Sequence, residues 1–119
     1  MTSSRTRLVL LAGASLLATS ALSGPILDVW NGTVEMQDGV PVLRRCDVTQ
    51  TRYVLKPLEN PRILEQLPAA AVARGTKVSV TVIGAYEQSG PDAHILRVNA
   101  LQNIRVGHSC QLLDALDDL

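Results

Sequence analysis

The chain has 119 residues, enough for one domain, and its 11 basic residues balance its 11 acidic ones. A net charge of zero excludes the long-range attraction to nucleic acid or membrane surfaces that strongly basic proteins have. The chain has one Trp, two Tyr and no Phe, so it is poor in the stacking platforms of single-stranded nucleic-acid binders, and we expect no nucleic-acid partner.

The first 23 residues have the pattern of a secretory signal peptide. Arg5 and Arg7 precede an apolar run over residues 8–18, and small residues follow it. The run is shorter than the roughly 20 residues that a membrane span needs. We therefore expect a leader over 1–23, a mature domain over 24–119 without a transmembrane segment, and a periplasmic or secreted protein. A cleavage site after Ser20 and an uncleaved membrane anchor are the alternatives.

Two cysteines, Cys46 and Cys110, remain in the mature chain. In an oxidising compartment an even number of cysteines predicts a disulfide. That bond closes a loop of about 65 residues and is worth roughly 4 kcal/mol, because it restricts the unfolded chain. Two separate thiols or a metal pair are the alternatives. His108 lies near Cys110, but His-x-Cys alone is a weak metal signal, so we expect no metal and no cofactor.

Five segments have the residue patterns of β-strands. The clearest is 77–84, where three valines alternate with other residues and Gly84 ends the run. Gly32 predicts a bulge or a sharp coil inside the first strand, and Asp38-Gly39 predicts a tight hairpin after it. A turn-rich loop over 86–93 separates the last two strands. The four other strands are expected at 27–37, 40–45, 51–56 and 94–106.

Helical signals lie between the third and fourth strands and at the end of the chain. Asn60-Pro61 begins the first helical segment, Pro68 divides it and Gly75 ends it. The resulting order is that of the OB-fold, so we predict a mainly β, five-stranded OB-fold-like barrel with a helix between strands three and four and a short C-terminal helix.

The C-terminal segment 111–119 has leucines at helical spacing. We expect these leucines to pack against the end of the barrel, with Asp114 and the other aspartates facing outward. Docking of this segment on a partner is the alternative. The leucines are Leu112, Leu113, Leu116 and Leu119.

Three stretches also carry a family resemblance: Gly32-Thr33-Val34, the run 43–47 leading into 52–55, and the strand 78–84. On these residues the chain resembles small secreted bacterial OB-fold proteins, including the OB domain of the envelope-stress and copper-homeostasis lipoprotein of the outer membrane. The resemblance implies an OB-fold and a place in the cell envelope, and it carries no catalytic residues over. The chain lacks a lipid-anchor cysteine and a Cys-x-x-Cys pair, so copper handling is not implied.

An OB barrel usually binds its ligand across strands two and three, between the loops that join strands one and two and strands four and five. We expect this face to collect four cations and to have a tyrosine nearby, and arginine forks suit carboxylate and phosphate groups. The partner is then an anionic small ligand or an acidic surface of an envelope protein. A solvated sheet face, whose cations discourage edge pairing, is the alternative. The expected site residues are Arg44, Arg45, Arg52, Lys56, Tyr53 and Tyr86.

These patterns predict a binding module rather than an enzyme. The alternative is a structural or accessory subunit of a bacterial envelope assembly, held through a sheet edge or through residues 111–119. A hydrolase ranks last, because His94 and His108 have no Ser or carboxylate at a catalytic spacing.

Overall fold

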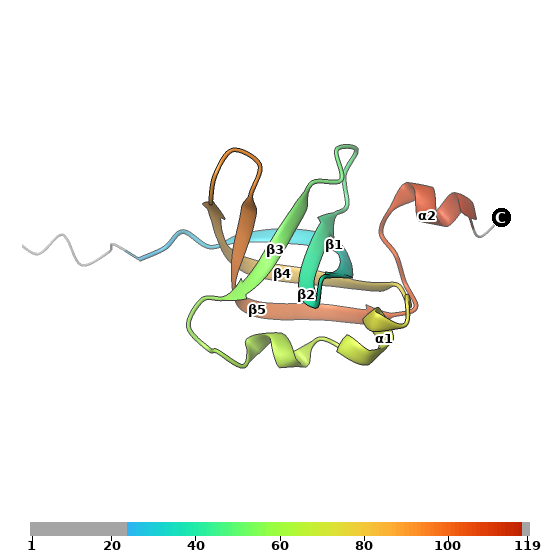
Figure 1. The fold of residues 1–119 in the computed structure, drawn as a ribbon, viewed down its shortest axis with the longest axis horizontal. Helices are drawn as coiled ribbons and strands as arrows, with labels where there is room; N and C mark the ends of the chain where they lie inside the picture. Colours follow the sequence, from blue (N-terminus) through green and yellow to red (C-terminus); the bar gives the residue numbers. More distant parts are fainter. Residues whose placement is uncertain (1–23, 118–119) are drawn as a thin grey trace, which may run out of the picture.

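Five strands close into a barrel in the computed structural model, which describes residues 24–117 (Figure 1). The strands run in the order β1-β2-β3-β5-β4 around the barrel, and β1 pairs with β4 to close it. The β3–β5 pair is parallel, and the other pairs are antiparallel. This topology confirms the predicted OB-fold-like barrel. The leader predicted over 1–23 lies outside the described residues. The strands are β1 (Asp28–Gln37), β2 (Val40–Arg45), β3 (Arg52–Pro57), β4 (Val78–Gln88) and β5 (His94–Val106).

The first strand, β1, pairs with two other strands. Its first half pairs with β4 and its second half with β2, and Gly32 and Thr33 pair with both. The register runs through Gly32 without a shift, so the bulge that we considered there is wrong. A Cβ at Gly32 would lie 2.6 Å from the carbonyl oxygen of Arg44 and 2.6 Å from the Leu43 side chain, so the glycine allows close approach of β2.

The hairpin between β1 and β2 follows the prediction. Asp38 and Gly39 have φ angles of 53° and 79°, which is the left-handed conformation that a type I′ turn requires at both central positions.

The fourth strand is longer than the sequence pattern indicates. Gly84 does not end β4, which continues to Gln88, and the expected loop over 86–93 is correspondingly shorter. Gly84 is instead needed inside the strand, because a Cβ there would collide with the backbone carbonyl of Arg97 on β5. The register of the β4–β5 pair shifts between Ile83 and Gly84, at the same place.

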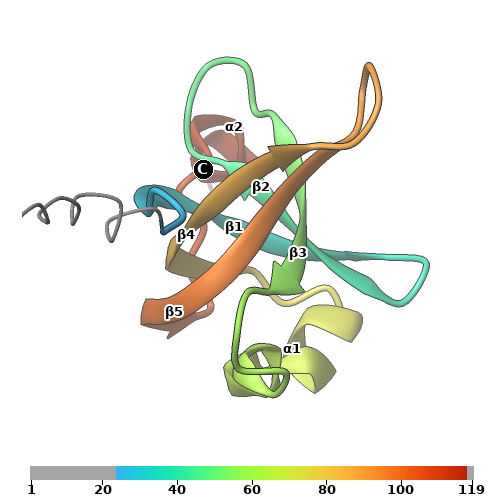
Figure 2. The same ribbon diagram turned by 90° about the vertical axis from the view of Figure 1, so that its left-hand side faces the viewer.

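The core lies inside the barrel and extends to the helical segment after β3. Two short helices, η2 (Ile63–Gln66) and α1 (Ala69–Ala73), cover one end of the barrel, as Figure 2 shows. η2 begins at Ile63, two residues later than the start predicted at Pro61, and Asn60 Oδ1 accepts the backbone N–H of Arg62 at 3.0 Å in the preceding turn. Gly75, with a φ of 85°, follows the last residues of α1 as predicted. The inward side chains alternate along each strand, as period two requires. The buried cluster includes Val34, Leu43, Leu55, Ile63, Leu67, Val72, Val78, Val80, Val82, Leu96 and Val98.

The last element of the described residues is α2 (Leu112–Asp117), which lies beside the barrel rather than within it (Figure 1). No helix in residues 24–117 is both long and apolar enough to cross a membrane.

Candidate functional site

A disulfide joins the end of β2 to the segment after β5. The Cα atoms of Cys46 and Cys110 lie 5.5 Å apart, and the two sulfur atoms are bonded, which confirms the predicted pairing. The backbone N–H of Cys46 also donates to the carbonyl of Asn31 on β1 at 2.9 Å. The disulfide therefore fixes the start of the C-terminal segment against the barrel wall.

Gln111, next to the disulfide, is a second anchor for this segment. Its side chain is 2% exposed, and Nε2 donates to the carbonyls of Arg44 at 2.8 Å and Arg45 at 3.1 Å. Its backbone N–H donates to Ser109 Oγ at 3.0 Å. The buried amide thus occupies the two carbonyls that β2 presents at its end.

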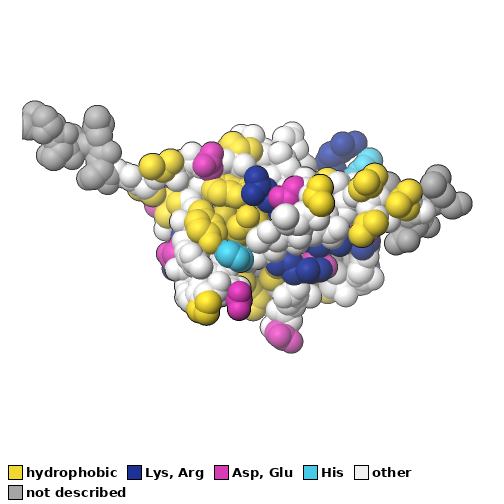
Figure 3. Space-filling model, turned by 90° about the horizontal axis from the view of Figure 1, so that it is seen from above, with side chains coloured by type: hydrophobic (Ala, Val, Ile, Leu, Met, Phe, Trp, Pro, Cys, Tyr) yellow, Lys and Arg dark blue, Asp and Glu magenta, His cyan; other side chains and the backbone are white. Residues whose placement is uncertain are grey.

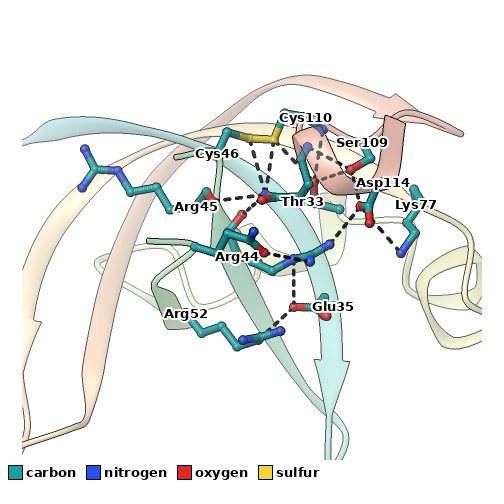
Figure 4. Close-up of polar contacts among 12 residues, drawn as sticks. Thr33, Glu35, Arg44, Arg45, Cys46, Arg52, Lys77, Ser109, Cys110 and Asp114 are labelled. Atoms are coloured by element: carbon teal, nitrogen blue, oxygen red, sulfur yellow. Dashed lines mark hydrogen bonds and ion pairs between the residues drawn. A yellow bond between two sulfur atoms is a disulfide. The ribbon is translucent and has the colours of Figure 1, made fainter. Parts of the chain in front are cut away.

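The guanidinium of Arg44 is the third anchor, and Figure 4 shows it between the barrel and α2. Arg44 is 9% exposed, and its Nη2 lies 2.9 Å from Asp114 Oδ2. Nη1 donates to Gln50 Oε1 at 3.2 Å, and Nε lies 3.6 Å from Glu35 Oε1, outside hydrogen-bond geometry. A buried arginine of β2 is therefore neutralised by a carboxylate that the C-terminal helix supplies.

Asp114 faces the barrel, so the expectation that it faces outward is wrong. Its carboxylate accepts a hydrogen bond from Ser109 Oγ and lies 3.7 Å from Lys77 Nζ. The hydrogen bond from Ser109 lowers the pKa of Asp114 below its ordinary value, and the positive charges of Arg44 and Lys77 act in the same direction.

The expected cationic face is only partly assembled. Arg52 lies opposite Arg44 on the neighbouring strand, and its Nε is 3.2 Å from Glu35 Oε1, so Glu35 stands between the two arginines. Lys56 alternates with buried Leu55 on β3 and is exposed, and it forms no ion pair with the residues that the structure describes.

Arg45 leaves β2 on the opposite side from Arg44. In Figure 4 its side chain points away from the Arg44 guanidinium and from α2, as the alternation along a strand requires. Its Nε lies 3.3 Å from Asp47 Oδ2 in the following turn. The four predicted cations therefore divide between two sides of the sheet.

The two predicted tyrosines lie together in an aromatic cluster. Tyr53 is buried, and its ring centroid lies 6.4 Å from that of Trp30, 6.1 Å from that of Tyr86 and 5.8 Å from that of His94. Tyr86 is 45% exposed, and its Oη lies 2.6 Å from Nδ1 of His94. Sequence reasoning included Tyr53 and Tyr86 but missed Trp30 and His94. The signal that could have found His94 is the β4–β5 pairing, which sets Tyr86 and His94 on the same face.

The leucines of α2 do not pack against the barrel, so that expectation is wrong. Leu112 is 75% exposed, Leu113 is 56% exposed and Leu116 is 54% exposed, and Val48 in the β2–β3 loop is 97% exposed. Figure 3 shows exposed hydrophobic side chains along the end of the molecule that carries α2. A cavity of about 430 Å³ beside the disulfide is lined in part by Val48, Leu112 and Leu113. We call the set Val48, Leu112, Leu113 and Leu116 the leucine surface.

In the described part of the chain, no group of three or more His, Cys, Asp or Glu residues is placed to hold a metal ion.

No family model and no curated protein matches the chain. Among solved structures, the chain is similar to the Cpx pathway activator NlpE from Escherichia coli, known from a crystal structure, with a TM-score of 0.53 and 14% sequence identity. The match covers 85% of this chain and 53% of that one, so the chain spans about half the length of its structural relative. At this identity the likeness supports the fold, an OB-like barrel.

Proposed function

We propose that the chain is a non-catalytic binding module of the bacterial envelope, and that it docks on a partner protein through the leucine surface. The observation that carries this proposal is the orientation of α2. An amphipathic helix of a globular protein normally turns its apolar side to the core. In α2 the polar side, with Asp114, faces the barrel, and Leu112, Leu113 and Leu116 face solvent.

The polar anchors give a reason for this orientation. The disulfide, the Gln111 amide and the Arg44–Asp114 ion pair hold the segment without using any leucine. The leucines are then free to contact another molecule, and the anchored helix loses little conformational freedom when it binds. Such preorganisation favours affinity, because less ordering entropy is lost on association.

The side chains of this segment also indicate what kind of partner surface would fit them. A helix that presents leucines at this spacing fits an apolar groove on another protein. In the sequence, Asp117 and Asp118 directly follow Leu116. Charge complementarity therefore favours a groove with lysines or arginines at its rim, which would speed association and fix the orientation of the helix.

The proposed location rests on two features. The sequence of residues 1–23 has the pattern of a secretory leader, and a structural disulfide is typical of oxidising compartments such as the periplasm.

The proposal is tested by capture from the native envelope fraction with a cross-linker. Three forms of the protein are compared: the wild type, a variant with Leu112, Leu113 and Leu116 changed to Ser, and a variant with Arg52 and Lys56 changed to Glu. A partner identified by mass spectrometry should be captured by the wild type and by the charge variant and lost from the leucine variant. The purified partner should then bind the wild type and not the leucine variant. Retention by the leucine variant would contradict the proposal.

A second candidate function is recognition of an anionic ligand on the outer face of β3. It is favoured by the exposed Lys56 and by Arg52, whose side chain is 50% exposed despite its pairing with Glu35. In the same experiment, loss of the partner from the Arg52/Lys56 variant alone would support this candidate.

A further inference from the structure

We propose that the aromatic cluster at the end of the barrel binds a sugar ring of a neutral glycan. The cluster is formed by Trp30, Tyr53, Tyr86 and His94, and it is independent of the leucine surface. It lies at the end of β3 that is distant from η2 and α1, because Tyr53 is near the start of β3 and the helical segment follows its end.

The first observation is that the chain concentrates its aromatic residues at this one place. The sequence has one Trp, two Tyr and no Phe, and all three aromatic residues belong to the cluster. They come from three strands, β1, β3 and β4, and β5 adds His94. The remaining core is filled by aliphatic side chains, so the chain does not depend on aromatic rings for its packing elsewhere.

The second observation is that the rings contact one another and that part of the cluster is exposed to solvent. Tyr53 is 6% exposed and contacts the three other rings, so it forms the buried part of the cluster. The rings of Tyr86 and His94 lie 5.8 Å apart with their planes inclined by only 32°. The hydrogen bond between Tyr86 Oη and His94 Nδ1, at 2.6 Å, holds both side chains in this arrangement. Tyr86 is 45% exposed, so a ligand can contact its ring from solvent.

These features fit the chemistry of a pyranose ring. The apolar C–H face of a sugar can lie on a tyrosine or histidine ring, while its hydroxyl groups need hydrogen-bond partners at the edge of the platform. Tyr86 Oη can exchange one more hydrogen bond, and the second ring nitrogen of His94 is a further polar atom. The β4–β5 loop, residues 89–93, borders His94 and corresponds to a loop with which OB-folds bind oligosaccharides.

Charge distinguishes a neutral glycan from a nucleic acid. Binding of a single strand requires a basic groove that follows the phosphates, in addition to stacking. The charged pairs on β4–β5 and in the β2–β3 loop are internally balanced, since Arg97 pairs with Glu87 and Arg45 pairs with Asp47. In Figure 3 one cationic and one acidic side chain lie next to each other beside a hydrophobic patch.

The test uses Trp30 as a reporter, because it is the only tryptophan in the chain. The purified protein is titrated with three neutral oligosaccharides (the β-1,4-linked trimer of N-acetylglucosamine, cellotriose and maltotriose) and, separately, with a single-stranded oligothymidylate. We expect at least one sugar to change the Trp30 fluorescence in a saturable way. Tyr86→Ala should weaken the binding of that sugar by tenfold or more. Tyr86→Phe keeps the ring and should weaken the binding less. Val106→Ala is the matched control, since Val106 is also exposed, at 54%, and should bind as the wild type does.

Amide chemical shifts of the wild-type protein give a readout that does not depend on any variant being folded. The sugar that binds should shift the amides of residues 86–94 and the indole of Trp30, and leave α2 unchanged. The proposal is overturned if no sugar binds saturably at concentrations up to about 10 mM, if Tyr86→Ala binds as the wild type, if the shifts lie elsewhere, or if the oligothymidylate binds and the sugars do not.

Discussion

At the scale of single residues, Arg44 connects the barrel to the C-terminal helix. Its guanidinium is almost buried and lies within reach of Asp114, Gln50 and Glu35. A buried charge of this kind is stable only while its partners remain in place, because removing one partner leaves the other desolvated and unpaired. Arg45, one residue further along, is half-exposed, and within residues 24–117 it forms an ion pair with Asp47 alone.

The pair Arg44 and Arg45 therefore offers a matched comparison. We expect Arg44→Met to lower the free energy of unfolding by about 1–3 kcal/mol, because it leaves the Asp114 carboxylate without its closest cation. Arg45→Met should change it by no more than about 0.5 kcal/mol, since exposed ion pairs contribute little. Urea denaturation of the two variants measures both values, and equal losses would contradict the role assigned to Arg44.

Asp114 should also make the stability of the protein depend on pH. Because its pKa is lowered in the folded state, the folded protein favours the ionised carboxylate. This contribution is fully present above the ordinary pKa of Asp, about 3.9, and is lost as the pH falls through the lower folded pKa. The difference in unfolding free energy between the wild type and Asp114→Asn should be constant between pH 6 and 8 and shrink below about pH 4. A difference that stays constant or grows on acidification would show that Asp114 is not held as an anion.

The positions of single side chains could be predicted from the sequence only in part. Residues two apart on a strand share a face, so Arg52 and Lys56 lie on one face of β3 and Tyr53 lies on the other. The prediction that Arg44 and Arg45 share one face of the sheet is wrong, because neighbouring residues of a strand point to opposite sides. Asp114 lies 70 residues from Arg44 in the sequence, and no local pattern links the two.

At the scale of elements, the strand order was predictable and the strand ends were less so. Hydrophobic alternation and the Asp38-Gly39 turn were sufficient to place five strands and one hairpin. The sequence pattern predicts a strand end at Gly84 because glycine often interrupts strands, whereas in the structure β5 approaches Gly84 so closely that only glycine fits. Such tertiary contacts leave no mark in the local sequence.

Gly84 gives a direct test of that close approach. We expect Gly84→Ala to destabilise the protein by about 1–3 kcal/mol, because the added methyl group meets the Arg97 carbonyl, which is backbone and cannot turn aside. Gly24→Ala is the control, since a Cβ there has no neighbour within 4 Å. Thermal unfolding followed by circular dichroism compares the two. If Gly84→Ala melts at the temperature of the control, β4 and β5 are further apart than described.

The C-terminal helix could be predicted from the local sequence, but its orientation could not. Leucine spacing predicted a helix, and α2 is present. The periodicity cannot tell which side faces the barrel, because this is decided by the disulfide, the Gln111 amide and the Arg44–Asp114 pair. Three polar or covalent anchors outweigh the usual preference of leucines for the core, and the leucine surface results.

At the scale of the whole molecule, the barrel separates regions of different chemistry. One end is covered by η2 and α1, and α2 stands beside the barrel wall (Figures 1 and 2). The aromatic cluster lies towards the other end, and the described leucines of α2 are exposed. The element order was sufficient to predict an OB-like barrel, because few topologies join three strands, a helix and two strands in this way. The positions of the two proposed binding regions required the three-dimensional arrangement, since each combines residues from distant parts of the sequence.

The central claim is that α2 presents its leucines to a partner, and position-resolved photo-cross-linking tests it most directly. A photoreactive amino acid is placed singly at Leu113, at Leu116, at Lys56 and at Val106, all of which are exposed, and each protein is irradiated in its native envelope. The account predicts the same cross-linked partner from positions 113 and 116, none from 106, and loss of the product when Leu112 is also changed to Asp. Cross-links from position 56 with none from 113 or 116 would contradict it and place the binding surface on the outer face of β3.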